Sequence, residues 1–444
     1  MRSPDFGRSP GELWWRPDLV VDARGQSPTV VTDAAESAVP FWALMTFSFI
    51  LVIAPQEIFP ILGPLRIALL TASTAVIAYL LDRFGRGRPI TLMTREMWVL
   101  AALVAWAVVT VPLSTWPGGS VAFLFAFFFK SLAIFWLLCN VVSSVTRLRQ
   151  VAWLLSLMAV PLAATAVANF LSATFLPGLV AQSTKRILGY DAPLTGNPND
   201  LALMLNMVIP ITVALFLTVE RPGLRTVLAA AVALDVLGVI VTFSRGGFLT
   251  LATLAGAYVW KLRGRPERAW AWTAVAIALA CLPLLPAGYV NRMESMTDID
   301  SDVTRSARLR WDDAATALKY VAANPIVGGG IGQNTLALNK ERGGTGWSAI
   351  HNVYLEIAVE LGIPGLILFL MLLTGCLKSV SRVQRWCAGV PARRDLFHLA
   401  EGIQISLIGF SVAALFHPVA HHLYFYYFAA LAIAAHAIAQ EGRG

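Results

Sequence analysis

Charged residues are scarce in this 444-residue sequence: Asp, Glu, Lys and Arg make up 14% of it, whereas hydrophobic residues make up 57%. A soluble globular chain usually contains about a quarter of charged residues. The mean hydropathy is +0.67, and long apolar runs recur along most of the chain. These features exclude an ordinary soluble protein and predict an all-α, polytopic integral membrane protein.

Cysteine is also rare, since the sequence contains only Cys139, Cys281, Cys376 and Cys387. All four lie in or beside apolar runs, and no pair has the Cys-x-x-Cys spacing of a zinc site. His417, His421 and His422 cluster before the last apolar run, but no cysteine or carboxylate accompanies them in sequence. We therefore expect these histidines to line a pocket or the membrane interface, with no metal and no cofactor.

The apolar runs predict about twelve transmembrane helices. Their ranges are 40–55, 62–81, 97–113, 120–142, 150–170, 200–219, 226–243, 246–260, 269–289, 353–377, 403–417 and 423–439. Connections rich in Lys and Arg alternate with connections almost free of them, which predicts that the basic connections and both termini are cytoplasmic. The net charge of +8 follows from this topology and requires no nucleic-acid partner.

This topology divides the chain into four parts. Residues 1–39 form a cytoplasmic tail, and 40–290 form the first nine spans. Residues 291–351 form a large, partly helical outer loop. Residues 352–444 form the last three spans and a short cytoplasmic C-terminus. Lys130 lies within the fourth span, where we expect it to be paired inside the bundle.

Two predicted outer segments contain arginines, against the general charge trend. Arg186 precedes Gly196-Asn197-Pro198-Asn199-Asp200, which is typical of a turn followed by a helix N-cap. Arg245 lies in Ser244-Arg245-Gly246-Gly247, where two glycines permit a tight reversal between two spans. The alternative for Arg245 is an arginine that only reaches lipid head groups.

The stretch Ser348–Gly365 changes from polar to apolar and leads into a predicted span. In a helix, Asn352, Glu356 and Glu360 lie on one face because their spacing is four residues. His351 precedes them directly. Carboxylates in a membrane helix are costly unless they face a polar cavity or a partner, so we favour a functional site over polar residues at a helix end.

The outer loop is predicted to contain an amphipathic helix at the membrane interface over 303–323. Its expected apolar face is formed by Ala307, Trp311, Ala314, Ala315 and Leu318. Its charged face is formed by Arg305, Arg308, Asp312 and Asp313. The glycine-rich segment Asn324–Gly332 follows. It lacks the Gly-Lys-Ser/Thr of a nucleotide-binding loop, so we interpret it as a turn that folds the loop back over the membrane face.

The outer side therefore gathers arginines, a histidine and carboxylates. Arginine suits phosphate oxygens because its planar fork remains charged, and a histidine of near-neutral pKa can accept a proton from a hydroxyl. This set favours transfer of a glycan from a lipid diphosphate. A non-catalytic anion or lipid-linked glycan transporter could use the same arginines. Two observations oppose a transporter: the polar residues lie at one face, and no internal repeat is visible.

Four segments resemble the O-antigen ligase and polymerase superfamily: Ser244–Gly247, Ser306–Trp311, Asn324–Gly332 and His351–Gly365. The most specific is His351-Asn-Val-Tyr-Leu-Glu356 followed by Glu360-Leu-Gly-Ile-Pro-Gly365. The resemblance implies a metal-independent glycosyltransferase of the GT-C type in the bacterial inner membrane, with a periplasmic active site. Its donor would be an undecaprenyl-diphosphate-linked glycan. Its acceptor would be lipid A–core for a ligase and another lipid-linked glycan for a polymerase. The motifs do not separate the two, and we favour the ligase.

The resemblance also implies roles for individual residues. Arg245 and Arg308 would hold the diphosphate, and His351 would act on the acceptor hydroxyl. The remaining candidates for substrate binding are Arg186, Arg305, Asn199, Asn352, Tyr354 and Glu356. Arg305 and Arg308 are one helical turn apart, so either could contact the diphosphate.

Overall fold

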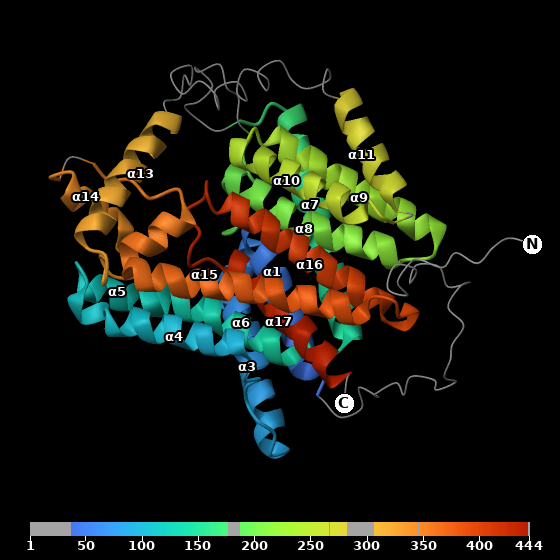
Figure 1. Ribbon diagram of the computed structural model, residues 1–444, viewed down its shortest axis with the longest axis horizontal. Helices are drawn as coiled ribbons and strands as arrows, with labels where there is room; N and C mark the ends of the chain where they lie inside the picture. The colour runs from blue at the N-terminus through green and yellow to red at the C-terminus, as the bar shows by residue number, and fades with distance from the viewer. Residues whose placement is uncertain (1–36, 176–186, 266, 282–305, 345, 443–444) are drawn as a thin grey trace, which may run out of the picture.

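The protein is all-α in the computed structural model, which describes residues 37–175, 187–265, 267–281, 306–344 and 346–442 (Figure 1). The described part contains no strand beyond an isolated bridge between Phe175 and Ile187. The helices of the first half are α1 (Val39–Ile53), α2 (Pro55–Ile58), α3 (Ile67–Gly85), α4 (Arg95–Val109), α5 (Pro117–Phe123), α6 (Phe129–Val141), α7 (Val145–Leu171) and α8 (Pro198–Thr218).

The helices of the second half are α9 (Pro222–Val241), α10 (Arg245–Leu262), α11 (Arg268–Cys281), α13 (Ser306–Ala323), α14 (Asn334–Glu341), α15 (Val353–Cys387), α16 (Arg394–Ala413) and α17 (Leu423–Glu441). Short 3-10 turns cover Pro60–Leu65, Val111–Leu113 and Pro391–Arg393, and one π-helical turn covers Leu124–Phe128 between α5 and α6.

Within the described ranges, eight helices are long and apolar enough to cross a membrane, and the shorter α1 is also apolar. This confirms a polytopic membrane protein. Each of the twelve predicted ranges overlaps a helix, but α1, α4, α10 and α11 do not meet the same length and hydropathy criteria. The number twelve therefore stays a prediction. Residues 282–289 of the ninth range and residues 1–36 of the tail predicted over 1–39 lie outside the described residues.

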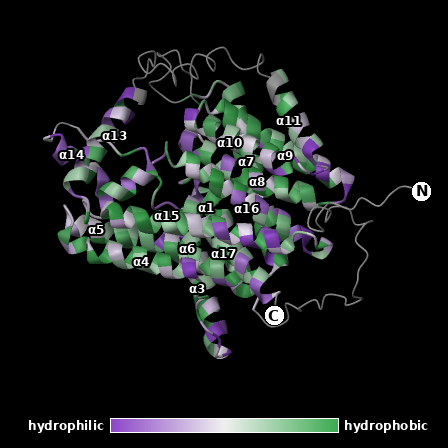
Figure 2. Cartoon of the chain, in the orientation of Figure 1, coloured by the Kyte–Doolittle hydropathy of each residue, from purple (hydrophilic) through white to green (hydrophobic). Residues whose placement is uncertain are grey.

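The centre of the bundle is formed by α8, α16 and α17, whose apolar windows are about four-fifths buried: 83%, 78% and 83%. α3 is 6% buried and projects from one flank (Figure 1). Hydrophobic residues dominate the helices of the bundle, whereas hydrophilic residues are frequent in α13 and α14 (Figure 2). The apolar surface of the bundle and the polar surface of the outer helices fit a membrane domain with an outer cap.

α15 is broken at Gly362, where φ is +68°. Two features of the sequence explain the break: glycine adopts this left-handed φ readily, and Pro364 has no N–H to continue the helical pattern. The N–H of Ile363 bonds instead to the carbonyl of Pro325, at 2.8 Å. An unbroken helix of 35 residues would measure about 52 Å, which exceeds a bilayer core of about 30 Å. The break allows the first two turns of α15 to belong to the outer cap.

The glycine-rich segment satisfies the backbone groups that this break leaves open. In an uninterrupted helix, the carbonyl of Val359 would accept from the N–H of Ile363, whereas the carbonyl of Glu360 would lack a donor because Pro364 has no N–H. Here they accept from the N–H groups of Gly329 and Gly330, at 2.7 and 2.8 Å. Because each buried backbone group needs a partner, these bonds fix the loop on α15. The prediction that Asn324–Gly332 folds back is confirmed in this form.

The outer helices pack on the start of α15 through a second apolar cluster. Its buried members are Ala317, Tyr320, Ala337, Leu338, Ile350 and Val359. The helix predicted over 303–323 is present as α13. Trp311 and Leu318 of its expected apolar face are exposed, and the position of this face at the membrane interface stays a prediction. The expected charged face differs in one respect, since Asp313 is buried. Asp313 is tolerated there because it pairs with Arg342 and accepts from Ser348 Oγ at 2.7 Å.

The prediction for Lys130 is also wrong. Its neighbour Ser131 faces the protein and donates to the carbonyl of His421 at 3.0 Å. This orientation of α6 turns Lys130 outward, where it is exposed and forms no ion pair with any residue of the described segments.

Candidate active site

The Ser244–Gly247 motif places Arg245 at the first position of α10. Ser244 caps the helix, since its Oγ accepts from the N–H of Gly247 at 3.1 Å. A Cβ at Gly246 would lie 2.9 Å from Phe416 Cβ, and one at Gly247 would lie 2.8 Å from Ala202 Cβ. The two glycines therefore permit α10 to approach both α8 and the loop after α16.

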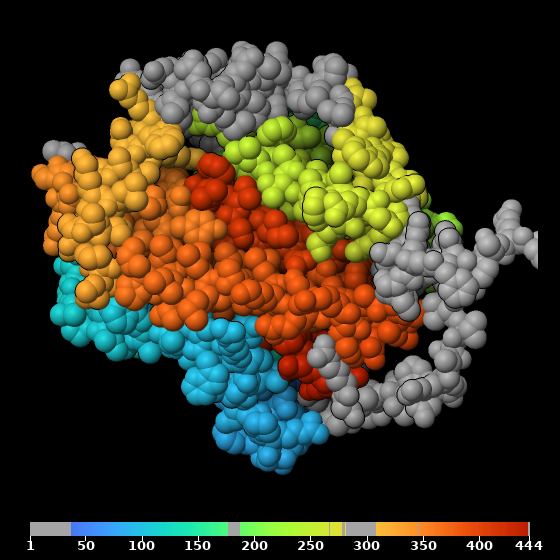
Figure 3. Space-filling model, in the orientation of Figure 1, coloured from blue at the N-terminus to red at the C-terminus, as the bar shows by residue number. Residues whose placement is uncertain are grey.

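The loop between α16 and α17 lies at the centre of these contacts. In the space-filling view, the red segment that includes the end of α16 is exposed between the orange outer helices and the yellow-green helices near α10 (Figure 3). His417 in this loop is buried, and its Nε2 lies 3.1 Å from the carbonyl oxygen of Asn199. Its Cε1 would lie 3.4 Å from a Cβ at Gly246. One loop thus joins the starts of α8 and α10.

The Asn197–Asp200 segment forms the predicted helix start. Asn197 is the N-cap of α8, and its Oδ1 accepts from the N–H of Asn199 at 2.8 Å. Asn199 is half-buried and presents its backbone carbonyl to His417. The structure therefore gives Asn199 a role in positioning His417, and its predicted contact with substrate stays a prediction.

His351 has the geometry of a general base. Its Nδ1 lies 2.9 Å from the carbonyl oxygen of Ala349, which accepts only, so Nδ1 carries the proton and Nε2 keeps a lone pair. Burial is the main cause that lowers the pKa of His351, and the charge of Arg310 lowers it further; Asp313 opposes both. A lowered pKa keeps His351 neutral near pH 7, as proton acceptance requires.

Arg310 is the cation that the structure brings to the histidines. Its charge lowers the pKa of both His351 and His417, although burial is the largest cause in each case. Arg310 is half-buried on α13, whereas Arg308 is exposed two residues earlier. Arg186 and Arg305 lie outside the described residues. The roles predicted for these three arginines stay predictions.

Three predicted substrate-binding residues make contacts within the protein. The Oδ1 of Asn352 caps α15 by accepting from the N–H groups of Tyr354 and Leu355, at 2.9 and 3.1 Å. The hydroxyl of Tyr354 donates to the carbonyl of Ser411 at 2.8 Å. Glu356 Oε2 accepts from the N–H of Ala420 at 3.2 Å. These contacts position the start of α15, and substrate binding by the three side chains stays a prediction.

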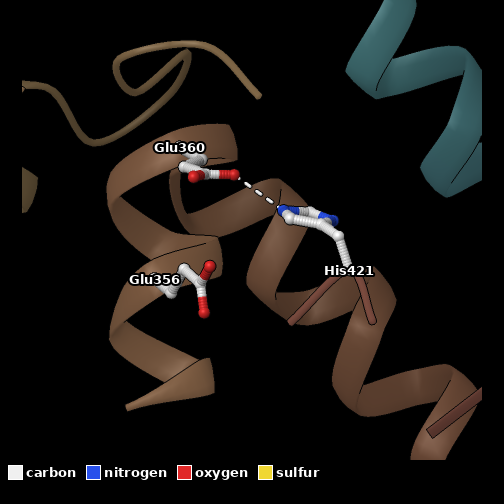
Figure 4. Close-up of side chains that lie close together, drawn as sticks. All are labelled: Glu356, Glu360 and His421. Atoms are coloured by element: carbon white, nitrogen blue, oxygen red, sulfur yellow. Dashed lines mark hydrogen bonds and ion pairs between the residues drawn. The ribbon is translucent and has the colours of Figure 1, made fainter. Parts of the chain in front are cut away.

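Glu356 and Glu360 share a face of α15 as predicted, and this face points to His421. Glu356 and Glu360 lie on one side of α15 opposite His421 (Figure 4). His421 Nε2 lies 2.7 Å from Glu360 Oε2, and Glu360 Oε1 accepts from Asn334 Nδ2 at 2.7 Å. Glu360 thus connects α14, α15 and the loop before α17.

The ligand atoms of Glu356, Glu360 and His421 lie within 4.8 Å of one another, and all three residues are buried. By type and spacing, this set could hold a metal ion. No carboxylate lies near the histidines in sequence, and the fold brings Glu356 and Glu360 to His421; the expectation of no metal stays a prediction. Both carboxylates already accept N–H donors, so the group also works as a hydrogen-bonded junction.

Sequence reasoning missed Arg310, the contact of His417 with Asn199 and the role of Glu360 as a connector. Arg310 and Asp313 are three residues apart, so they share a face of α13, and Asp313 is the residue buried against Arg342. The position of Arg310 on the same helix face as Asp313 could therefore have identified Arg310 from the sequence. No sequence pattern brings His417 to Asn199, which precedes it by 218 positions.

Residues 228–370 match the family model described as O-antigen ligase. The matched range contains Arg245, Arg308, Arg310, His351 and Glu360. No curated protein sequence matches the chain at a significant level.

Proposed function

Because the chain is a member of the O-antigen ligase and polymerase superfamily, we propose that it is a ligase-type glycosyltransferase of the bacterial inner membrane. It moves a glycan from undecaprenyl diphosphate to a hydroxyl of lipid A–core at the periplasmic face, without a metal. One observation carries this proposal: the charge of Arg310 lowers the pKa of both His351 and His417, and His417 lies against the start of α10, although the three residues come from separate segments.

In this proposal, arginines bind the diphosphate of the donor. Arg245 and Arg308 fill the positions implied by the family resemblance, and Arg310 is added because of its place beside His351. Arg245 also lies at the N-terminus of α10, where the helix dipole favours an anion. Their charges stabilise the diphosphate as it leaves, because negative charge grows on it in the transition state.

His351 serves as the general base for the acceptor. The acceptor hydroxyl oxygen forms a bond to the anomeric carbon of the donor sugar, and its proton passes to Nε2 of His351. The bond between that carbon and the diphosphate oxygen breaks, and undecaprenyl diphosphate leaves with the electron pair. The contact of Nδ1 with Ala349 supports this role because it directs the lone pair to Nε2.

The topology proposed from the sequence completes this account. Both termini and the basic connections lie in the cytoplasm, and the outer cap of α13 and α14 lies in the periplasm. The substrate-binding face then opens on the side where lipid A–core and the lipid-linked glycan meet. The exposed Trp311 and Trp347 would contact the membrane interface there.

The same chemistry would also serve a polymerase, which differs only in its acceptor. The test uses purified protein with an undecaprenyl-diphosphate-linked glycan in EDTA, with lipid A–core in one arm and only further donor in the other. We expect product on lipid A–core alone. A ladder of glycan on the carrier lipid would mean a polymerase. No product in either arm, with transport of the donor in vesicles, would mean a transporter and would overturn the proposed enzyme.

A further inference from the structure

His417 is held between two acceptors, which is unusual for a neutral histidine. Its Nδ1 lies 2.9 Å from the carbonyl oxygen of Ala413, and its Nε2 lies 3.1 Å from that of Asn199. Carbonyl oxygens only accept, and a neutral imidazole has one N–H. A neutral His417 therefore donates to one carbonyl and faces the other with a lone pair. The imidazolium form satisfies both.

The surroundings oppose that form in the absence of an anion. Burial is the main cause that lowers the pKa of His417, and the charges of Arg310 and His351 lower it further; the two carbonyls raise it. Arg245 precedes Gly246 at the start of α10, where a Cβ at Gly246 would lie 3.4 Å from His417 Cε1. Asp200, next to Asn199, is the acidic residue on the α8 side. The charges that lower the pKa of His417 thus come from α13 and from the segment that precedes α15.

A bound diphosphate would reverse this balance, because its negative charges would offset the arginines. We infer that His417 takes up one proton from solvent when the diphosphate of the donor binds. This inference rests on the proposed function. The proton goes to the ring nitrogen that faced a carbonyl with its lone pair, and the new N–H donates to that carbonyl. No other bond is formed or broken.

Proton uptake by His417 would protect the base of the reaction. A bound anion raises the tendency of His351 to become protonated, which would remove the lone pair on Nε2. A positive charge on His417 opposes this effect, since each histidine disfavours a proton on the other. His417 is buried and bonded to the backbone at both nitrogens, so it does not touch the substrate. It is a positioning residue that acts through His351.

Calorimetry tests this inference. The full-length protein in detergent is titrated near neutral pH with a short prenyl-diphosphate-linked monosaccharide, whose phosphates have no group that titrates in this range. The titration is repeated in buffers of different ionisation enthalpy, and the dependence of the heat on the buffer gives the number of protons taken up. We expect about one proton per bound ligand for the wild type. We expect almost none for His417→Gln, and the wild-type value for His351→Gln.

The outcomes separate the inference from the proposed function. Binding without proton uptake in the wild type, or unchanged uptake in His417→Gln, would overturn the role of His417. Failure of the wild type to bind the ligand would overturn the proposed function and this inference with it. If His417→Gln does not fold, 15N spectra of histidine-labelled His351→Gln protein provide the same answer. Ligand binding must then produce a histidine with both nitrogens protonated, and its absence would contradict the proposal.

Discussion

At the scale of single residues, the site depends on which proton each histidine carries. Backbone carbonyls determine this for both His351 and His417, because an acceptor-only oxygen selects a nitrogen that bears hydrogen. His351 keeps a lone pair at Nε2, whereas the lone pair of neutral His417 faces a carbonyl oxygen. His351 is therefore suited to accept a proton from the hydroxyl of the glycan acceptor, and His417 is suited to hold a positive charge.

The charge of Arg310 is expected to control the acid limb of the pH profile of kcat/KM. Catalysis needs neutral His351, so kcat/KM falls as pH falls through the pKa of this residue. Arg310 helps to lower that pKa, so Arg310→Gln should move the acid limb of the kcat/KM profile to higher pH. The exposed Arg308 provides the matched control: Arg308→Gln should reduce kcat/KM without moving the limb. An unmoved limb in Arg310→Gln would contradict this assignment.

The paired N–H donors of the Arg245 guanidinium group are expected to contribute to kcat/KM in addition to its charge. Arg245→Lys keeps the charge but loses the paired donors that match phosphate oxygens. We expect a loss of about tenfold or more in kcat/KM, because one charge-assisted hydrogen bond is worth roughly 1.5–3 kcal/mol. The measurement is donor-dependent transfer at saturating acceptor. Wild-type kinetics in Arg245→Lys would mean that Arg245 only reaches lipid head groups.

At the scale of elements, the break in α15 and the glycine-rich segment depend on each other. Gly362→Ala should be strongly destabilising. The left-handed φ costs a non-glycine residue about 1–2 kcal/mol, and the new Cβ would lie 2.1 Å from the carbonyl oxygen of Ile326. Thermal unfolding in detergent measures the effect. Gly256→Ala in α10 is the control, because that glycine is exposed with no atom within 4 Å of the added Cβ, and it should be neutral or slightly stabilising. Equal stability of both variants would show that the break is dispensable.

Glu360 is the element connector, and Glu356 is its matched control. The carboxylate of Glu360 accepts from the N–H and side chain of Asn334 and contacts His421. Glu356 accepts from one backbone N–H. Glu360→Gln replaces an acceptor by an amide donor that faces donors, so it should cost roughly 1–3 kcal/mol and slow transfer. Glu356→Gln should cost less in the same thermal unfolding assay. The reverse order would contradict the connector role.

At the scale of the whole molecule, the fold class followed from the sequence because hydropathy alone selects membrane helices. The ranges of all twelve apolar runs overlap helices. The local sequence Gly362-Ile363-Pro364 by itself indicates the break in α15. Orientation was harder to predict. The sequence did not predict that Asp313 of α13 is buried with Arg342. The prediction for Lys130 was wrong because the hydrogen bond of Ser131 sets the orientation of α6. The meeting of His417 with Asn199 depends on tertiary packing that no local pattern encodes.

The proposed topology predicts which exposed positions face the periplasm. In a Cys281→Ser background, the remaining cysteines, Cys139, Cys376 and Cys387, are buried. A cysteine at Trp347, which is 69% exposed in the outer loop, should react with a membrane-impermeant thiol reagent in intact spheroplasts. A cysteine at the exposed Gly264, between α10 and α11, should react only after permeabilisation. Labelling of both positions, or only of Gly264, in intact spheroplasts would overturn the orientation.

The central claim is that the outer site catalyses glycan transfer with His351 as its base. Its most direct test is single-turnover transfer to lipid A–core by purified wild type and His351→Gln, with donor binding measured on the same samples. The account predicts that donor binding is retained while transfer falls about 100-fold or more, because a positioned general base supplies at least that factor. Transfer by His351→Gln at the wild-type rate would contradict the account.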